Sequence, residues 1–254
     1  MIKKIVGFSL FLLFLLSCRE NTEDLSAYYF PFDELKEGKV YVFKSKDENI
    51  PIKDYWYYKS YTNEKGIRYL KAISLDRKGL PLQFVDYEID SAEVRLISMY
   101  IVERDKRGHT AIIPVKIEQP YIYNIELRDT SKALYAKIIW NNPFDSLEYT
   151  LQKVRTFKGF QQMKMDSKVH SIIRFEIATE FLTFTPHDGE THSAWPEYEI
   201  YSKGMGLVEY KISPDPDFPI QMRLDKIYTK AEYQRLFHIH LDSLRPSLKG
   251  VQRR

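Results

Sequence analysis

Residues 169–185 read V-H-S-I-I-R-F-E-I-A-T-E-F-L-T-F-T, and residues 174–177 within this stretch alternate polar with apolar side chains. In a strand, such an alternation places the apolar side chains on one face and the polar ones on the other. A strand with one buried and one wet face favours antiparallel pairing over a parallel sheet covered on both sides. Residues 221–225, Q-M-R-L-D, repeat the pattern. Both stretches therefore predict half-buried antiparallel strands.

Segments rich in Tyr, Val, Ile and Phe recur on either side of residues 169–185, with turn residues at their ends, as is typical of strands. The other predicted strands are 38–44, 54–61, 67–75, 82–89, 93–104, 109–117, 121–127, 134–140, 148–157, 197–212 and 220–228. Residues 63–66 (N-E-K-G) and 105–108 (D-K-R-G) predict hairpin turns, in which glycine supplies a positive φ. No helical pattern separates the strands, which argues against parallel β/α units.

One helix is predicted near the C-terminal end of the chain. Thr229 and Glu232 have the spacing of a capping box, and Tyr233, Leu236 and Phe237 follow on one face. We therefore expect an all-β fold, built as a large curved antiparallel sheet, an open barrel or a sandwich, with a short C-terminal helix that covers one open end. The sequence leaves these three architectures open.

The composition limits the class of protein. The 254 residues are 44% hydrophobic and 29% charged, so the chain has the apolar content for a core and is not a disordered protein. The net charge is only +3, which argues against a dedicated nucleic-acid binder. No linker or repeat interrupts the chain after Tyr28, and we expect residues 28–254 to form a single β-rich domain.

Residues 1–17, M-I-K-K-I-V-G-F-S-L-F-L-L-F-L-L-S, have the parts of a secretory signal peptide. Lys3 and Lys4 precede an apolar run of about twelve residues, whereas a bilayer-spanning helix needs ~20. The alternative is a signal anchor that stays in place. We expect the segment to be removed, because the run is short.

The tetrapeptide Leu15-Leu16-Ser17-Cys18 resembles a bacterial lipobox, in which the cysteine becomes the first mature residue. The resemblance implies a covalent diacylglyceryl lipid on Cys18, and we expect no other cofactor. Two or more acyl chains anchor a protein stably, since each buried methylene contributes about 0.8 kcal/mol. Residues 18–27 would then be the lipidated cysteine and a polar tether. Cys18 is the only cysteine, so a cysteine nucleophile is excluded.

The residues after the cysteine are polar and rich in acids. Glu20, Glu23 and Asp24 resemble the acidic cluster that serves as an export signal in surface lipoproteins of Bacteroidota. The simpler interpretation is a solvated tether. The resemblance implies an outer-membrane location, on either the periplasmic or the cell-surface face.

Residues 195–210, W-P-E-Y-E-I-Y-S-K-G-M-G-L-V-E-Y, are similar to a segment of secreted proteins of the TapB-like group. These proteins are often described as relatives of the β-sheet folds of periplasmic lipoprotein carriers. The resemblance implies a β-sheet fold and brings no catalytic residue with it. From the residues alone, Gly204 and Gly206 predict a bulge or tight turn between two strands.

Residues 54–61, D-Y-W-Y-Y-K-S-Y, hold five aromatic side chains in eight positions. On a strand, Tyr55, Tyr57 and Tyr61 face one side, and Trp56 and Tyr58 face the other. Either both faces are buried, or one face binds a ligand. The second alternative makes these five residues a candidate site for a glycan, a peptide or a lipid.

His187, Asp188, Glu190 and His192 bring four candidate metal ligands into one predicted loop. Imidazole and carboxylate groups together can hold zinc or another divalent ion. The alternative is an ordinary exposed turn with solvated histidines.

Sequence signatures of hydrolases and of phosphate-binding loops do not occur in the chain. We therefore predict a non-enzymatic envelope protein, anchored by lipid, that binds an apolar ligand or a protein partner through its sheet. The alternative is a lipid-anchored metal-dependent hydrolase that uses residues 187–192.

Overall fold

The computed structural model describes residues 23–127, 132–185, 189–213 and 218–244. Its strands are β1 (Glu23–Asp24), β2 (Lys39–Ser45), β3 (Lys53–Thr62), β4 (Arg68–Leu75), β5 (Pro81–Ile89), β6 (Glu93–Arg104), β7 (Thr110–Pro114), β8 (Lys116–Asn124), β9 (Glu126–Leu127), β10 (Leu134–Asn142), β11 (Leu147–Met165), β12 (Lys168–Thr185), β13 (Gly189–Ser202), β14 (Gly206–Ile212) and β15 (Ile220–Thr229). Its helical elements are the 3-10 turns η1 (Ser26–Tyr28), η2 (Phe32–Leu35) and η3 (Leu241–Ser243) and the helix α2 (Lys230–Phe237).

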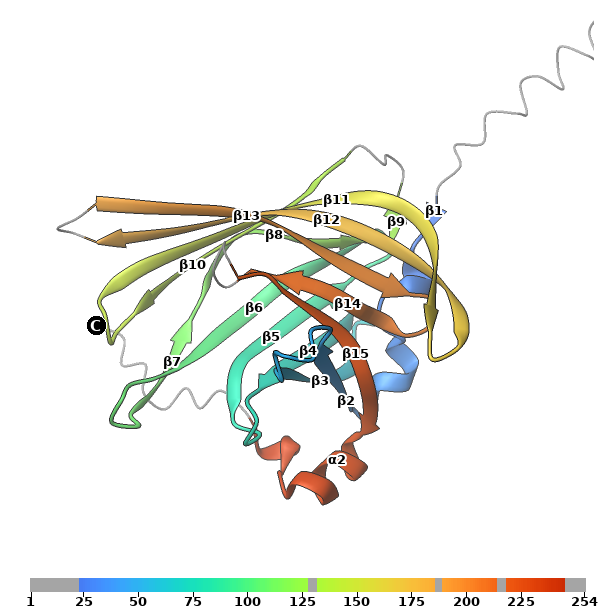
Figure 1. Cartoon of the computed structure of the whole chain (residues 1–254), viewed down its shortest axis with the longest axis horizontal. Helices are drawn as coiled ribbons and strands as arrows, with labels where there is room; N and C mark the ends of the chain where they lie inside the picture. The colour runs from blue at the N-terminus through green and yellow to red at the C-terminus, as the bar shows by residue number, and fades with distance from the viewer. Residues whose placement is uncertain (1–22, 128–131, 186–188, 214–217, 245–254) are drawn as a thin grey trace, which may run out of the picture.

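Twelve of the described strands form a closed antiparallel barrel (Figure 1). Their order is β5-β4-β3-β2-β15-β14-β13-β12-β11-β10-β8-β6, and the ring closes because β6 also pairs with β5. The first part of β6 pairs with β8, and the later part pairs with β7. The predicted all-β fold with a C-terminal helix is confirmed. Of the expected architectures the structure is a barrel, but a closed one rather than an open one.

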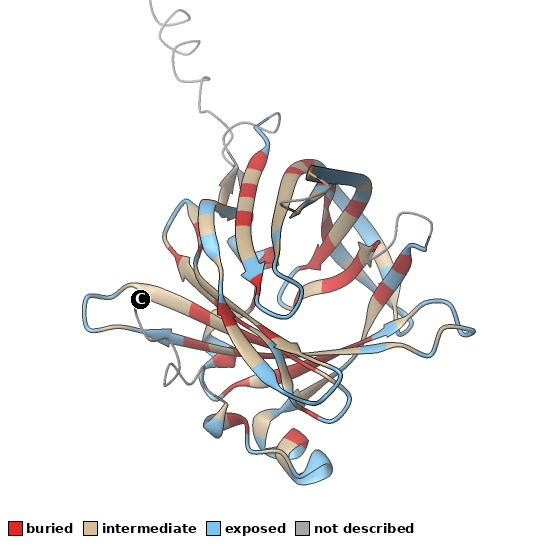
Figure 2. Cartoon of the chain, turned by 90° about the vertical axis from the view of Figure 1, so that its left-hand side faces the viewer, coloured by how far each residue is buried: buried red, intermediate tan, exposed pale blue. Residues whose placement is uncertain are grey.

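Where polar and apolar residues alternate along a strand, they lie in turn outside and inside the barrel. In β12, Phe175 and Ile177 are 2% exposed, whereas Glu176 between them is exposed. Figure 2 shows buried positions alternating with intermediate or exposed ones along several strands. The strand β11 is longer than predicted, because residues 160–165 also pair with β12 although they lack an apolar alternation. The strand predicted over 197–212 is two strands: β13 begins at Gly189, where it pairs with β12, and the turn at Gly204 separates it from β14.

The helix α2 packs on the outer face of the barrel (Figure 1). Its predicted capping box is present: Thr229 Oγ1 accepts a hydrogen bond from the Glu232 backbone, and the Glu232 carboxylate accepts one from the Thr229 backbone. Tyr233 is 1% exposed and packs in one cluster with Val42 and Tyr57. The expectation that the helix covers an open end was wrong, because an apolar patch on the outer face needs that cover.

Residues 25–35 close one end of the barrel instead, and we call them the N-terminal plug. Leu25 and Leu35 are fully buried, and the aromatic side chains of residues 28–30 are at most 8% exposed. The Ala27 carbonyl accepts a hydrogen bond from Gly204 at 2.8 Å, in the turn between β13 and β14. The short turns of the plug lie at one end of the barrel in Figure 1.

The plug alters the expected boundary between tether and domain. Glu23 and Asp24 pair with β9, and the Leu25 backbone N–H donates to the Ile125 carbonyl at 2.7 Å. Residues 23–27 of the expected tether therefore lie against the barrel, because Leu25 supplies an apolar side chain to the core.

Every described element lies between residues 23 and 244, so a chain that begins at residue 19 contains the whole barrel with its plug and helix. In this part of the chain, no helix has the length and apolar character needed to span a bilayer.

Candidate functional site

A cavity of about 420 Å³ lies inside the barrel. Tyr29 and Phe30 of the plug line it at one end. Its volume falls within the range of small-molecule sites, roughly 300–1,000 Å³. Most of its wall is apolar or aromatic, and the aliphatic part includes Val85, Leu96, Met99, Ile138, Leu151 and Ile212. Its polar side chains are Asp54, Ser74, Gln83, Lys153, Arg155 and Glu199.

The aromatic strand β3 forms part of this wall. Trp56 and Tyr58 line the cavity, whereas Tyr55 and Tyr57 face the other way and pack under α2. Tyr57 is only 3% exposed, and the Tyr55 ring centroid lies 6.3 Å from that of Tyr233. The outer face of the strand is thus buried, and the inner face is turned to a cavity. Ligand binding on the inner face stays a prediction.

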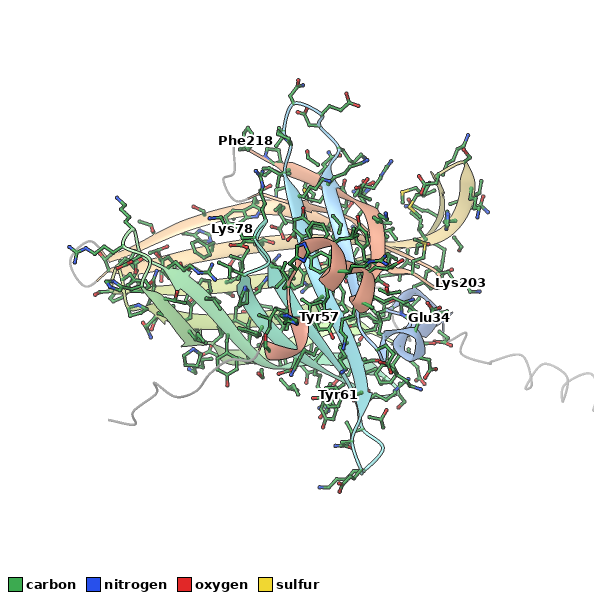
Figure 3. All side chains as sticks on the ribbon, turned by 90° about the horizontal axis from the view of Figure 1, so that it is seen from below. Glu34, Tyr57, Tyr61, Lys78, Lys203 and Phe218 are labelled. Atoms are coloured by element: carbon green, nitrogen blue, oxygen red, sulfur yellow. The ribbon has the colours of Figure 1, made fainter. Side chains whose placement is uncertain are left out.

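Tyr61 lies outside this arrangement. It sits near the end of β3, well away from Tyr57 in Figure 3, and is 42% exposed. Its ring stacks on Tyr69, with 5.1 Å between the ring centroids. Of the five predicted aromatic residues, the structure therefore brings Trp56 and Tyr58 together at the cavity and leaves Tyr61 on the surface.

A buried ion pair forms the polar part of the wall. Arg155 on β11 and Glu199 on β13 reach across β12: Arg155 Nε and Nη2 donate to the Glu199 carboxylate at 3.3 and 3.2 Å. Tyr201 donates to the same carboxylate at 3.0 Å. Burial is the largest influence on the pKa of Glu199 and raises it, but the charges of Arg155 and Lys153 and the hydrogen bonds from Arg155 and Tyr201 together hold that pKa below its usual value.

The third nitrogen of the Arg155 guanidinium, Nη1, is buried and has no hydrogen-bond partner among the described residues. The residue as a whole is 7% exposed. Most buried polar groups in proteins are hydrogen-bonded, so an orphaned donor in a side chain that lines the cavity needs an explanation.

A second ion pair stands beside the first. Lys153 donates to Glu197 at 2.6 Å, again across β12. Glu197 also accepts hydrogen bonds from Thr179 at 3.0 Å and from Trp195 at 2.9 Å. Burial is the largest influence on the pKa of Glu197 and raises it, but the charge of Lys153 and the hydrogen bonds from Lys153, Trp195 and Thr179 together lower it. Both pairs are therefore neutral overall, and they leave no net charge on this part of the wall.

The remaining carboxylate of the cavity belongs to Asp54, which accepts hydrogen bonds from Trp56 at 2.8 Å and from Tyr210. Burial raises its pKa above the usual value. Burial also raises the pKa of Tyr87, near the Arg155 pair, to about 12. The phenol of Tyr87 is thus protonated at neutral pH and able to donate a hydrogen bond.

Sequence reasoning missed the ion pairs. In the sequence, the only sign of these ion pairs is two like charges spaced two residues apart on each strand: Lys153 and Arg155 on β11, and Glu197 and Glu199 on β13. Their partnership depends on both strands pairing with β12 in one register, which places Ile177 opposite both Arg155 and Glu197. That register is a property of the folded sheet.

The candidate metal ligands are only partly placed. His187 and Asp188 lie outside the described residues. Glu190 and His192 belong to β13 rather than to a loop, because the hairpin with β12 is longer than expected. His192 Nε2 lies 4.0 Å from Glu180, and both side chains are about half exposed. Within the described ranges, no three histidine, cysteine or acidic residues are grouped closely enough to hold a metal ion.

Comparisons with known proteins bear on the fold. No protein-family model matches the chain, and no curated protein matches it in sequence. The TapB-like resemblance therefore stays a prediction.

Among solved structures, the chain is similar to a candidate exported protein of Bacteroides fragilis with a YmcC-like fold. The TM-score is 0.52 at 10% identity, over 79% of this chain and 98% of that chain. A candidate lipoprotein of Parabacteroides distasonis gives a TM-score of 0.47 at 13% identity, over 79% and 98% of the two chains. The hypothetical lipoprotein YmcC of Escherichia coli gives 0.31 at 11% identity, over 76% and 88%. The likeness to the Bacteroides fragilis protein shows that the chain has a YmcC-like fold.

Proposed function

We propose that this chain is a lipid-anchored protein of the bacterial cell envelope that binds an apolar ligand inside its barrel. The cavity is the observation that carries the proposal. Protein interiors are normally close-packed, and a void forfeits the contacts that its lining atoms would make. A hollow of about 420 Å³ with mostly apolar walls is therefore costly when empty and favourable when an apolar molecule fills it.

The aromatic side chains favour a small ligand over a protein partner. Trp56 and Tyr58 face the cavity, and α2 covers the outer face of the same strand. Four of the five aromatic side chains on this strand are thus turned inward or covered, and only Tyr61 among them is exposed to a protein partner.

The sequence supports the membrane anchor. The apolar run and the lipobox resemblance end at Cys18, and β1 begins five residues later at Glu23. Five residues span at most ~18 Å, so a lipid on Cys18 would hold the plugged end of the barrel close to the membrane surface. The chains with similar folds include a candidate lipoprotein and a candidate exported protein, which accords with an envelope location. We place the protein at the outer membrane.

A neutral apolar fluorophore tests the cavity. N-phenyl-1-naphthylamine is titrated into the chain from residue 19, into the Ala136→Phe variant and into the Ala178→Phe variant. Ala136 lines the cavity and is 7% exposed, whereas Ala178 is exposed on β12. We expect saturable binding by the parent chain and by Ala178→Phe, and at least tenfold weaker binding by Ala136→Phe. Equal binding by all three chains, or none by the parent, would refute the proposal.

The anchor has its own test. The full chain and its Cys18→Ala variant are expressed in a bacterial host, and the membrane fraction is analysed by mass spectrometry. We expect the parent to carry the mass of an acylated Cys18 and to sediment with membranes. An unmodified Cys18 on the parent would contradict the proposed lipidation.

A further inference from the structure

We infer that the ligand is an apolar chain with an uncharged hydrogen-bond acceptor at its head, an acyl ester or amide carbonyl, and that Arg155 donates to this carbonyl. This inference rests on the proposed function and names the class of ligand. Its basis is the orphaned Nη1 of Arg155, whose side chain lines the cavity, together with the charge balance around this side chain and the apolar surface next to it.

The guanidinium is held in place by its other nitrogens. Nε and Nη2 both donate to Glu199, which fixes the plane of the group and leaves Nη1 on its remaining edge. Arg155 is more than nine-tenths buried, so bulk water does not readily satisfy Nη1. A ligand oxygen within hydrogen-bond distance of Nη1 would satisfy the donor that the protein leaves unpaired.

The charges around Arg155 select an uncharged acceptor. Glu199 already neutralises Arg155, and Glu197 neutralises Lys153. Asp54 adds a further carboxyl group to the same wall. A free carboxylate in the ligand would lose its hydration, approach Glu199 and meet no unpaired positive charge. A carbonyl oxygen accepts the same hydrogen bond without these costs.

The rest of the cavity suits a hydrocarbon chain. Leu151 lies two residues before Lys153 on β11 and shares its inner face, and Ile138 on β10 pairs with Leu151. Leu96 and Met99 line the cavity from β6. A ligand with its carbonyl at Arg155 would therefore lay its chain along aliphatic side chains.

Three ligands of equal chain length test the inference by displacing N-phenyl-1-naphthylamine from the chain that begins at residue 19. They are methyl decanoate, decane and decanoate. We expect methyl decanoate to bind about tenfold more tightly than decane, because it alone gains a hydrogen bond to a charged donor without burying a charge. We expect decanoate to bind more weakly than methyl decanoate.

Paired variants assign this preference to Arg155. The Arg155→Met/Glu199→Met variant removes the ion pair without leaving either charge unpaired, and Lys153→Met/Glu197→Met is the matched control at the neighbouring pair. We expect the ester-to-decane ratio of affinities to fall to about one in the first variant and to keep its parent value in the second. A preserved ratio in the first variant overturns the inference.

An infrared measurement keeps the inference testable if the variants fail to fold. Methyl decanoate labelled with ¹³C at its carbonyl is bound to the parent chain, and we expect its carbonyl band to shift to lower wavenumber than in hexane. Three results would overturn the inference: an unshifted band, equal binding of decane and methyl decanoate, or tighter binding of decanoate. None of them would contradict the proposal that the cavity binds an apolar ligand. Failure of all three ligands to displace the fluorophore overturns the proposed function itself.

Discussion

Replacing Phe30 by alanine would remove the centre of the N-terminal plug. The Phe30 side chain is 8% exposed, and its ring centroid lies 4.3 Å from that of Tyr58 and 5.7 Å from that of Tyr41. A buried aromatic side chain covers roughly 150 Å² of mostly apolar surface. At about 25 cal/mol per Å², this area corresponds to about 4 kcal/mol. Measured costs for such truncations, about 3–5 kcal/mol, agree with this value.

Phe30 also lines the cavity and therefore has fewer neighbours than a fully packed side chain, so we expect the lower part of that range, about 3 kcal/mol. Urea unfolding followed by tryptophan fluorescence measures the change. For an m-value of about 3 kcal/mol/M, the midpoint should fall by about 1 M with the slope unchanged. Because the variant also enlarges the cavity at the plug, we expect N-phenyl-1-naphthylamine to bind with a changed affinity.

Phe144 supplies the matched control, since it lies in the turn between β10 and β11 and is 41% exposed. We expect Phe144→Ala to change the free energy of unfolding by less than about 1 kcal/mol. If Phe30→Ala lowers the midpoint no more than Phe144→Ala does, the N-terminal segment does not pack in the barrel as described.

Three further predictions concern the helix, a turn and the buried ion pair. Tyr233→Ala should cost about 3 kcal/mol in urea unfolding, whereas Leu236→Ala on the same helix, 55% exposed, should cost little; equal losses would contradict the docking of α2. Gly204 and Gly206 both have positive φ, but only a Cβ at Gly206 would meet the plug, at 2.7 Å from Phe30 Cδ1, so Gly206→Ala should lower the melting temperature more than Gly204→Ala. The pKa of Glu199 is lower in the folded chain than its unfolded value of ~4.3, so the ionised carboxylate stabilises the fold at pH values above ~4.3. This contribution to the free energy of unfolding is lost as the pH falls through the folded pKa. The stability of the parent chain relative to Arg155→Met/Glu199→Met should therefore decrease below about pH 4 in urea unfolding at pH 3 to 7, and an increase would contradict the ion pair.

Many of the strands could be predicted, because the alternation of polar and apolar residues that marks a strand can be seen in a short stretch of sequence. Residues 93–104 and 169–185 match β6 and β12 to within one residue at either end. The capping box of Thr229 and Glu232 is equally local and equally visible. Closure of the barrel is different, because it depends on β2 pairing with β15 from the other end of the chain, and such a long-range pairing has no local sequence signal.

Only part of the candidate site could be predicted from the sequence, because the rest also depends on long-range pairing. The alternating faces of Trp56 and Tyr57 follow from strand geometry, so an inward aromatic face could be expected. Which face is inward depends on where α2 docks. The importance of Arg155 appears only when the register across β12 brings Glu199 to it and leaves Nη1 unpaired.

The most direct test of the account is a native mass spectrum of the chain isolated from bacterial envelopes without delipidation, beside its Ala136→Phe and Ala178→Phe variants. We predict that the parent and Ala178→Phe retain a non-covalent adduct, and that filling the cavity at Ala136 removes it. An adduct of the same abundance in all three chains, or none in the parent, would contradict the claim that the barrel holds a ligand.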